Sequence, residues 1–245
     1  MRIAHASIDE NKNAKGGEAG NQNGKEVCIS QWYNKPWTVL LRHPDRIVRE
    51  RIATIAETLA SPPVNRLIGY DQNERNTFHA QALANEYNLL DFINHATPCE
   101  TDCSAFVTCV CLFAGIKKLE YSGNAPTTST MKSVFKQAGF NVLTDSKYVS
   151  GIDYLSKGDI LLKPGSHVVI VLDDGGSYGK EQACFPKYTG TSYSLADALN
   201  EMGIDNSRKN RQKIYAANFP DKYTFSAAQN TAVLIKLKEG TLKRP

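Results

Sequence analysis

Residues 102–115 have the sequence DCSAFVTCVCLFAG and residues 158–172 the sequence GDILLKPGSHVVIVL, and these two stretches decide the fold. The first is an apolar run that follows a loop and ends at a glycine, which predicts a helix beginning near Cys103. The second holds two β-branched apolar runs on either side of a turn, which predicts two strands, the later one beginning at His167. The pattern therefore predicts a helix packed on a sheet, with a cysteine and a histidine each at the start of an element.

The order of the expected elements indicates the fold class. Helical apolar spacing comes first and β-branched runs come later, which is typical of an α+β domain with an antiparallel sheet rather than a wound parallel sheet. The polar, glycine- and asparagine-rich residues 9–26 predict a long loop. We place this domain at residues 1–185. The expected helices are 44–61, 74–88, 103–115 and 131–138, and the expected strands are 27–30, 140–144, 159–163 and 167–172.

Residues 190–245 are predicted to form a second, small module. Their apolar spacing and capping residues predict three short helices, and hence an all-α module. The whole chain has a net charge of +4, but residues 207–245 hold nine Lys and Arg against two acidic residues. This concentration of positive charge indicates an anionic partner, or else a solvated basic surface.

The composition excludes some classes of protein. Mean hydropathy is -0.39, and no apolar run approaches the roughly 18 residues of a transmembrane helix. We therefore expect no membrane insertion. The start of the chain has no apolar segment of the kind found in secretory signals. We expect a protein made in the cytoplasm, whose six cysteines are mostly reduced.

The sequence gives little support for a metal site. Cys109 and Cys111 would lie about 200° apart around a helix, so they cannot bind one zinc ion together. Asp9, Asn11 and Asn13 are spaced like the first ligands of a calcium loop, but Ala14 stands where an EF-hand has glycine. We expect no cofactor, and calcium is the alternative.

Cys103 and His167 are the candidate catalytic residues. A helix N-terminus favours the thiolate, so the pKa of Cys103 is predicted to be lowered. A histidine at the start of a strand is held rigidly enough to act as its base, and this order and placement are those of papain-type hydrolases. The alternative is that Cys103 is a small buried hydrophobe and His167 a structural hydrogen-bonding residue.

Asp-Cys-Ser at a helix start, followed about 60 residues later by Gly-Asp-Ile and His-Val-Val-Ile-Val-Leu, resembles the NlpC-type and CHAP-type cell-wall cysteine hydrolases. The strings HASIDEN, GKEV and IGYDQN resemble the catalytic domain of phage endolysins in that superfamily. The tail, from YTGTSYSLADAL onward, resembles a short module at the end of Gram-positive phage lysins. The resemblance implies a papain-like fold and a peptidoglycan amidase or endopeptidase that acts on the cell wall after release from the host cytoplasm.

The resemblance also implies a third polar residue about a dozen positions after the histidine. Position 179 is glycine, and a hairpin of residues 167–172 and 179–184 would bring Gln182 beside His167 instead. Glu26 and Asp71, from the resembling strings, are the alternatives.

The remaining site predictions concern substrate binding. Trp32 and Tyr70 are candidates to line the groove, although aromatic residues more often pack in cores. Asp102 is a further candidate and is alternatively a helix cap. The other histidines are predicted to be structural: His5, His43, His79 and His95.

Three classes of function therefore compete. They are a phage peptidoglycan hydrolase, another Cys–His enzyme such as a transglutaminase-like one, and a non-catalytic basic cell-wall-binding protein. For the first class the partner is the peptidoglycan of Gram-positive cell walls rather than nucleic acid. Residues 190–245 would then bind the wall, or alternatively pair with other subunits to form an oligomer.

Overall fold

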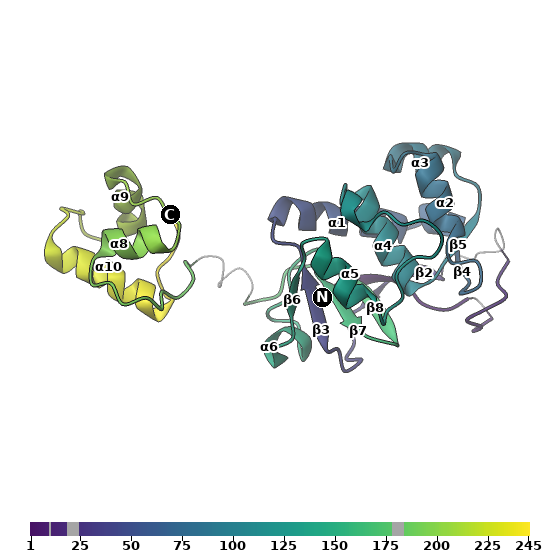
Figure 1. Ribbon diagram of the computed structural model, residues 1–245, viewed down its shortest axis with the longest axis horizontal. Helices are drawn as coiled ribbons and strands as arrows, with labels where there is room; N and C mark the ends of the chain where they lie inside the picture. Colours follow the sequence, from purple (N-terminus) through teal and green to yellow (C-terminus); the bar gives the residue numbers. More distant parts are fainter. Residues whose placement is uncertain (10, 19–24, 178–183) are drawn as a thin grey trace. The chain divides into compact units, whose positions relative to one another are not determined.

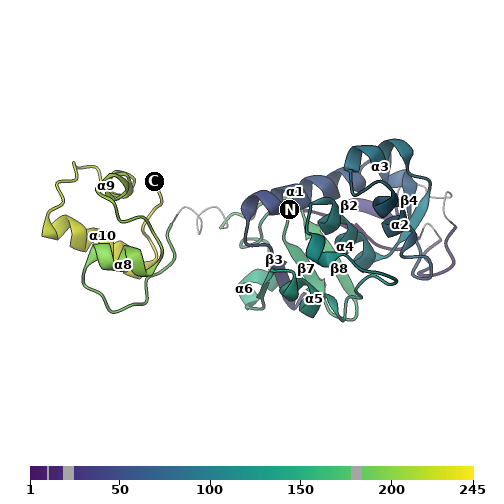
Figure 2. The same ribbon diagram turned by 45° about the horizontal axis from the view of Figure 1, so that its top comes forward.

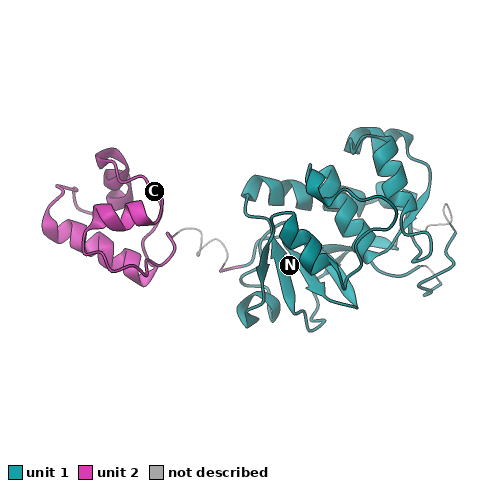
Figure 3. Ribbon diagram, in the orientation of Figure 1, with its two compact units in different colours: residues 1–175 teal, residues 176–245 magenta. Residues whose placement is uncertain are grey.

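The computed structural model describes residues 1–9, 11–18, 25–177 and 184–245. The chain divides into two compact units, residues 1–175 and residues 176–245 (Figure 3). In the described residues, no helix is both long enough and apolar enough to cross a membrane.

The first unit is built on an antiparallel sheet of six strands (Figure 1). Each neighbouring pair runs antiparallel. Across the sheet the strands are β2 (Val27–Gln31), β1 (Arg2–Ala6), β8 (His167–Val171), β7 (Ile160–Lys163), β3 (Val39–Arg42) and β6 (Asn141–Leu143). The α+β class with an antiparallel sheet is thus confirmed, although β1 and β3, which were not expected, also precede the first helix.

Strand β8 is buried along its whole length because both faces of the sheet are covered. Val168 and Ile170 face the large core, which lies under the helices. Val169 and Val171 face a smaller core on the opposite side, where Trp37 packs. This explains why the strand is a continuous apolar run rather than an alternating one.

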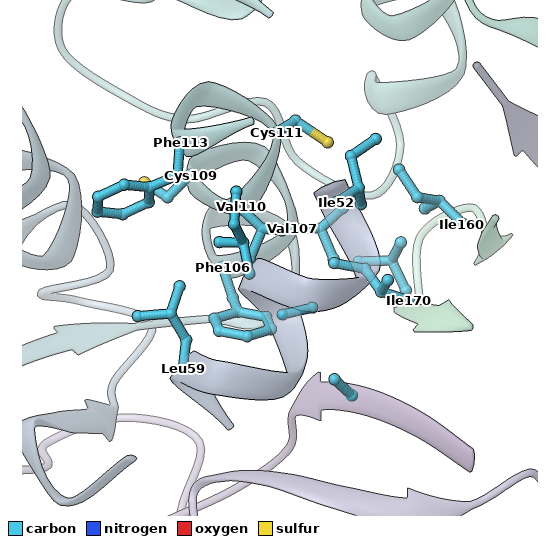
Figure 4. Close-up of a cluster of buried hydrophobic side chains, with 14 of the residues drawn as sticks. Ile52, Leu59, Phe106, Val107, Cys109, Val110, Cys111, Phe113, Ile160 and Ile170 are labelled. Carbon is cyan, nitrogen blue, oxygen red and sulfur yellow. The ribbon is translucent and has the colours of Figure 1, made fainter. Parts of the chain in front are cut away.

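Helices α1 (Arg46–Leu59) and α4 (Cys103–Phe113) cover one face of the sheet (Figures 1 and 2). Every residue of α4 is buried, including Cys109 and Cys111. Figure 4 shows Phe106 and Val110 of α4 near Leu59 of α1, within this large core. Because α4 is enclosed on all sides, its first residue is held firmly relative to the sheet.

The helix expected over 74–88 is shorter, and a further helix that was not expected follows it. α2 (Thr77–Ala84) and α3 (Leu89–His95) are separated by Glu86 and Tyr87, which have positive φ values of 52° and 54°. This left-handed backbone ends a helix. The other elements are η1 (Val64–Leu67), the parallel pair β4 (Ile68–Tyr70) and β5 (Cys99–Thr101), η2 (Lys117–Leu119), α5 (Met131–Gln137) and α6 (Ser146–Val149).

The expected hairpin between residues 167–172 and 179–184 conflicts with the pairing of β8. That strand pairs with β7 on one edge and with β1 on the other. Both edges are therefore already taken, and the place beside β8 belongs to the first strand of the chain. Gln182 itself lies outside the described residues.

The second unit contains the helices α8 (Leu195–Glu201), α9 (Arg208–Ala216) and α10 (Ala227–Glu239). Each begins after a serine whose side chain accepts a backbone N–H of the first turn, at Ser194, Ser207 and Ser226. A core of its own, including Leu199, Ile214 and Leu237, holds these helices together.

Candidate active site

A pair of histidines lies where β1 meets the start of β8. The Nδ1 atom of His5 is 3.2 Å from the Nε2 atom of His167, within hydrogen-bond distance. The two rings are nearly perpendicular, at 78° with centroids 5.4 Å apart. Pairing of β1 with β8 therefore brings together two imidazoles that are 162 residues apart in the sequence.

Aromatic rings cover this pair. The ring of Trp37 stacks near that of His167, with centroids 6.3 Å apart and an interplanar angle of 27°. Tyr33 lies 6.2 Å from the His5 ring. The indole N–H of Trp37 donates to the carbonyl of Tyr33 at 3.0 Å, which closes the turn that carries both rings. These contacts restrict the rotation of His167 and exclude water from one of its faces.

The other nitrogen of His5 contacts strand β2. Ser30 Oγ lies 3.1 Å from His5 Nε2, and Cys28 Sγ lies 3.7 Å from the same atom. Both ring nitrogens of His5 thus have partners, so the ring has a fixed orientation toward His167.

Cys103 is the first residue of α4, as the sequence predicts. Asp102 caps this helix, because its carboxylate accepts the N–H of Ala105 at 2.7 Å. The backbone N–H of Val168, the residue that follows His167, lies close enough to the Cys103 sulfur to oppose the rise in the pKa of its thiol. The thiol therefore lies against the start of β8, with 7% of the residue exposed.

Burial sets the charge state of all three groups. It raises the pKa of the Cys103 thiol to about 12, and the Asp102 charge adds to this, although the N–H groups of Val168 and Ser104 oppose it. The predicted lowering of this pKa by the helix N-terminus is thus wrong, because desolvation outweighs those donors. Burial likewise lowers the pKa of His167 to about 3 and that of His5 to about 4. At neutral pH the site holds a thiol and two neutral imidazoles.

The Asp102 carboxylate is held by a buried arginine. Arg75 Nε donates to Asp102 Oδ2 at 2.6 Å, and Arg75 Nη2 donates to Oδ1 at 3.1 Å. Ser104 Oγ also donates to Asp102, at 2.9 Å. With these partners and the Ala105 N–H, the carboxylate has the contacts of a helix cap.

The other predicted site residues lie at different places. The pKa of the Tyr70 phenol is raised to about 12, mainly by burial. The charge of Cys103 also contributes to this rise, so Tyr70 lies near the thiol. Asp71 accepts the backbone N–H groups of Gly16 and Asn73, at 3.1 Å and 2.7 Å.

Glu26 is buried and close enough to Cys28 to contribute to raising the pKa of that thiol, for which burial is the larger cause. Trp32 packs against the smaller core of the sheet. In the described part of the chain, the His167 side chain contacts His5 and Trp37.

His5 is the functional candidate that sequence reasoning missed. It was expected to be structural, and no local spacing links it to His167. One signal was available, since His5 opens the string HASIDEN that resembles phage endolysins.

The described residues contain no cluster of three or more His, Cys, Asp or Glu side chains placed to hold a metal ion. In the segment that resembles a calcium loop, the Asp9 carboxylate accepts the backbone N–H of Asn13. Its role there is to close a turn.

Comparison with known proteins gives one match. No curated protein and no solved structure matches the chain. A family model described as an endolysin-like domain matches residues 3–178. Since the match covers most of the 245 residues, the chain belongs to the endolysin-like domain family.

Proposed function

We propose that this endolysin-type protein is a cysteine hydrolase that cleaves an amide bond in peptidoglycan, the substrate that its family implies. The bond is in the stem peptide or cross-bridge, or joins the glycan to the peptide. One observation carries the proposal: His5 lies within hydrogen-bond distance of one nitrogen of His167, and Cys103, at the start of α4, lies beside the next backbone N–H of the same strand. A cysteine at a helix start packed on an antiparallel sheet also supports a papain-like fold.

The hydrogen bonds support one arrangement of protons. For Nδ1 of His167 to accept the thiol proton, its Nε2 must carry a hydrogen and donate it to His5 Nδ1. His5 then carries its own hydrogen on Nε2, where Ser30 Oγ is 3.1 Å away and accepts it. His5 is in this way a positioning residue that selects the tautomer of His167 able to act as a base.

Because the resting thiol is neutral, the reaction begins with a proton transfer. His167 takes the Cys103 proton as the sulfur attacks the amide carbonyl. The imidazolium then gives that proton to the departing amine, which leaves a thioester on Cys103. Water, deprotonated by His167, attacks the thioester and releases the carboxylate product, and the proton returns to the sulfur.

The helix N-terminus supplies the stabilising donors for this reaction. The backbone N–H of Cys103 is at the first position of α4, where helix N–H groups have no intrahelical acceptor. We assign it to the oxyanion of the tetrahedral intermediate. One such donor contributes roughly 3 to 4 kcal/mol to the transition state in hydrolases of this type.

We further propose that the second unit binds the cell wall. Its last 39 residues carry the excess of basic residues, and a second contact with an insoluble polymer raises the local substrate concentration. Pairing with other copies of the chain is the competing role for this unit.

Clearing of a Gram-positive cell-wall suspension tests the catalytic proposal. We expect Cys103→Ala to abolish clearing and His167→Ala to slow it by orders of magnitude. Cys109→Ala is the matched control, because Cys109 is buried in the same helix but is not part of the site. Clearing by Cys103→Ala at the wild-type rate would refute the mechanism. A lack of clearing by the wild type, with binding retained, would favour the non-catalytic alternative.

A further inference from the structure

Arg75 joins three segments around the start of α4. Besides its two bonds to Asp102, its Nη2 donates to Ser104 Oγ at 2.8 Å. Its Nη1 donates to the carbonyl of Ala125 at 2.8 Å, and Nη2 reaches that of Pro126 at 3.1 Å. The Arg75 and Asp102 side chains are only 10% and 12% exposed. A buried arginine with this many partners fixes the helix start and the loop at residues 125–126 together.

Asp102 is an unusual neighbour for a nucleophilic thiol. Its negative charge opposes formation of the Cys103 thiolate, while the Arg75 charge favours it. Neither effect is strongly screened, because the pair is buried. We propose that Arg75 is a positioning residue that holds Cys103 in place and cancels the Asp102 charge, so that the thiol is able to lose its proton during the reaction.

The charged and titratable groups around the thiol support this role. Tyr70 of β4 and Tyr33 of the turn after β2 lie close enough to the thiol for the Cys103 charge to act on their phenols, and His167 precedes Val168, whose backbone N–H is near the sulfur. Burial keeps them neutral at neutral pH, since it raises the pKa of both phenols and lowers that of the imidazole. The balance of charge at Cys103 therefore depends on the pair formed by Arg75 and Asp102.

The rate of alkylation of Cys103 by iodoacetamide measures this balance. Mass spectrometry of the peptide that contains Cys103 separates it from the other cysteines, and the full-length chain is used. Loss of the Arg75 charge leaves the Asp102 charge beside the thiol unopposed, and an unopposed like charge shifts a neighbouring pKa by about one unit. We therefore expect Arg75→Gln to slow alkylation about tenfold at pH 8, and Arg75→Lys, which keeps the charge, to stay within about threefold of wild type. The double variant Arg75→Gln/Asp102→Asn should recover most of the rate.

Two results would overturn the proposal. They are a folded Arg75→Gln variant with the wild-type alkylation profile, or a double variant as slow as the single one. If Arg75→Gln fails to fold, the Asp102→Asn variant decides, because asparagine still caps the helix. Its Cys103 thiol should be alkylated faster than that of the wild type, and an unchanged alkylation rate would count against the proposed role of Arg75. The proposal rests on Cys103 as the nucleophile. Alkylation requires no hydrolysis, however, so failure here and failure of the clearing assay are distinguishable.

A second inference concerns the other unit and rests on its proposed wall-binding role. A cavity of about 260 Å³ opens between the starts of α8 and α10, lined by residues that include Tyr193, Arg211 and Thr231. Arg211 is the charged residue of this lining. Its Nε atom is buried and makes no hydrogen bond of ordinary geometry among the described residues, although its guanidinium lies close enough to the Tyr223 phenol to oppose the rise in that group's pKa. Buried donors are rarely left unpaired, so this atom indicates a missing acceptor.

The chemistry of the lining fits an anion. The Arg208 and Arg211 guanidinium groups both lie near the Phe225 ring, at 5.0 Å and 5.6 Å from its centroid, which concentrates positive charge at this end of the unit. Hydroxyl groups of Tyr193 and Thr231 add further donors. We infer that the cavity binds a phosphate group of an anionic wall polymer, since a phosphate offers several acceptor oxygens to an arginine fork and neighbouring hydroxyls.

Sedimentation of the full chain with Gram-positive walls tests this site, in a Cys103→Ala background that leaves the walls intact. We expect Arg211→Gln to weaken binding about tenfold at physiological salt. Lys209→Gln is the matched control, because Lys209 is exposed on the same helix and this substitution removes the same charge. The Lys209→Gln variant should bind the walls less than twofold more weakly than the unsubstituted chain. Walls stripped of phosphodiester polymers by hydrofluoric acid should bind the unsubstituted chain weakly.

Equal losses for Arg211→Gln and Lys209→Gln would show that only net charge matters. Undiminished binding to stripped walls would exclude phosphate as the anion. If Arg211→Gln does not fold, Thr231→Val tests the same site, because it replaces the threonine hydroxyl with a methyl group of similar shape. We expect about threefold weaker binding to the walls for this variant. Binding at the wild-type level would refute the proposed phosphate site. Loss of binding here leaves hydrolysis of soluble muropeptides unchanged, which separates it from failure of the catalytic proposal.

Discussion

Replacing His5 with asparagine changes how stability depends on pH. In the folded protein the pKa of His5 is lowered to about 4 and that of His167 to about 3, mainly by burial. In the unfolded chain both return to about 6.5. As the pH falls below 6.5 the unfolded chain therefore takes up two protons that the folded chain does not, and the folded state loses stability until the pH reaches the folded pKa values.

The size of this loss follows from the number of protons. Each proton taken up by the unfolded chain alone costs about 1.4 kcal/mol per pH unit. Between pH 5.5 and 4.5 the two imidazoles together cost up to about 2.7 kcal/mol. In the His5→Asn variant only His167 remains, and it no longer feels the His5 charge that helps to lower its pKa. The contribution of the pair should fall to about 1.4 kcal/mol or less.

Urea unfolding at pH 6.5, 5.5 and 4.5, followed by tryptophan fluorescence, measures the difference. The chain has two tryptophans, and both lie in the first unit, so the signal reports the unit that carries the histidine pair. His95→Asn is the control because His95 is exposed on α3, and it should keep the wild-type slope. If His5→Asn has the same slope as wild type, the pair does not titrate as a buried neutral pair.

Three further predictions follow from the geometry. The alkylation rate of Cys103 should rise about tenfold per pH unit from pH 7 to 9, because its pKa is raised to about 12; a plateau in this range would show a preformed thiolate. Gly158→Ala should lower the free energy of unfolding by about 3 kcal/mol or more, because φ at Gly158 is +83° and a Cβ there would lie 2.0 Å from the Arg49 carbonyl oxygen. The control is Gly139→Ala, where φ is also positive but a Cβ would have no atom within 4 Å, and this variant should lose about 1 kcal/mol. Equal losses for the two variants in urea unfolding would contradict the prediction. Removing residues 190–245 should weaken wall sedimentation while leaving hydrolysis of soluble muropeptides largely intact, and a truncated chain that still sediments fully would remove the binding role from the second unit.

Local sequence signals were enough to predict the elements that carry Cys103 and His167. An apolar run after Asp102 gave the start of α4, and a turn followed by β-branched residues gave the start of β8. Apolar spacing, together with the capping residues that precede α9, likewise predicted the helices of the second unit. These features depend on neighbours within a few residues of each other.

What was missed depends on contacts between distant residues. Nothing in the five residues of β1 indicates that they pair with β8, so the partner of His167 was sought in the following residues instead. The charge state of Cys103 was also mispredicted, because the helix N-terminus is a local feature whereas the burial that outweighs it comes from the whole core. Arg75 has no motif, and its role becomes visible only through its partners at residues 102, 104, 125 and 126.

The position of β1 beside β8 has a consequence for synthesis of the protein. The two histidines are 162 residues apart, and ribosomes add roughly 5 to 20 residues per second. β1 therefore leaves the ribosome about 10 to 30 seconds before the strand that it must join. During that interval the nascent chain holds a first strand whose final neighbour does not yet exist, so the histidine pair forms only after the last strand of the sheet has emerged. Ribosome profiling combined with protease protection of stalled chains should show β1 becoming resistant only when β8 is outside the exit tunnel.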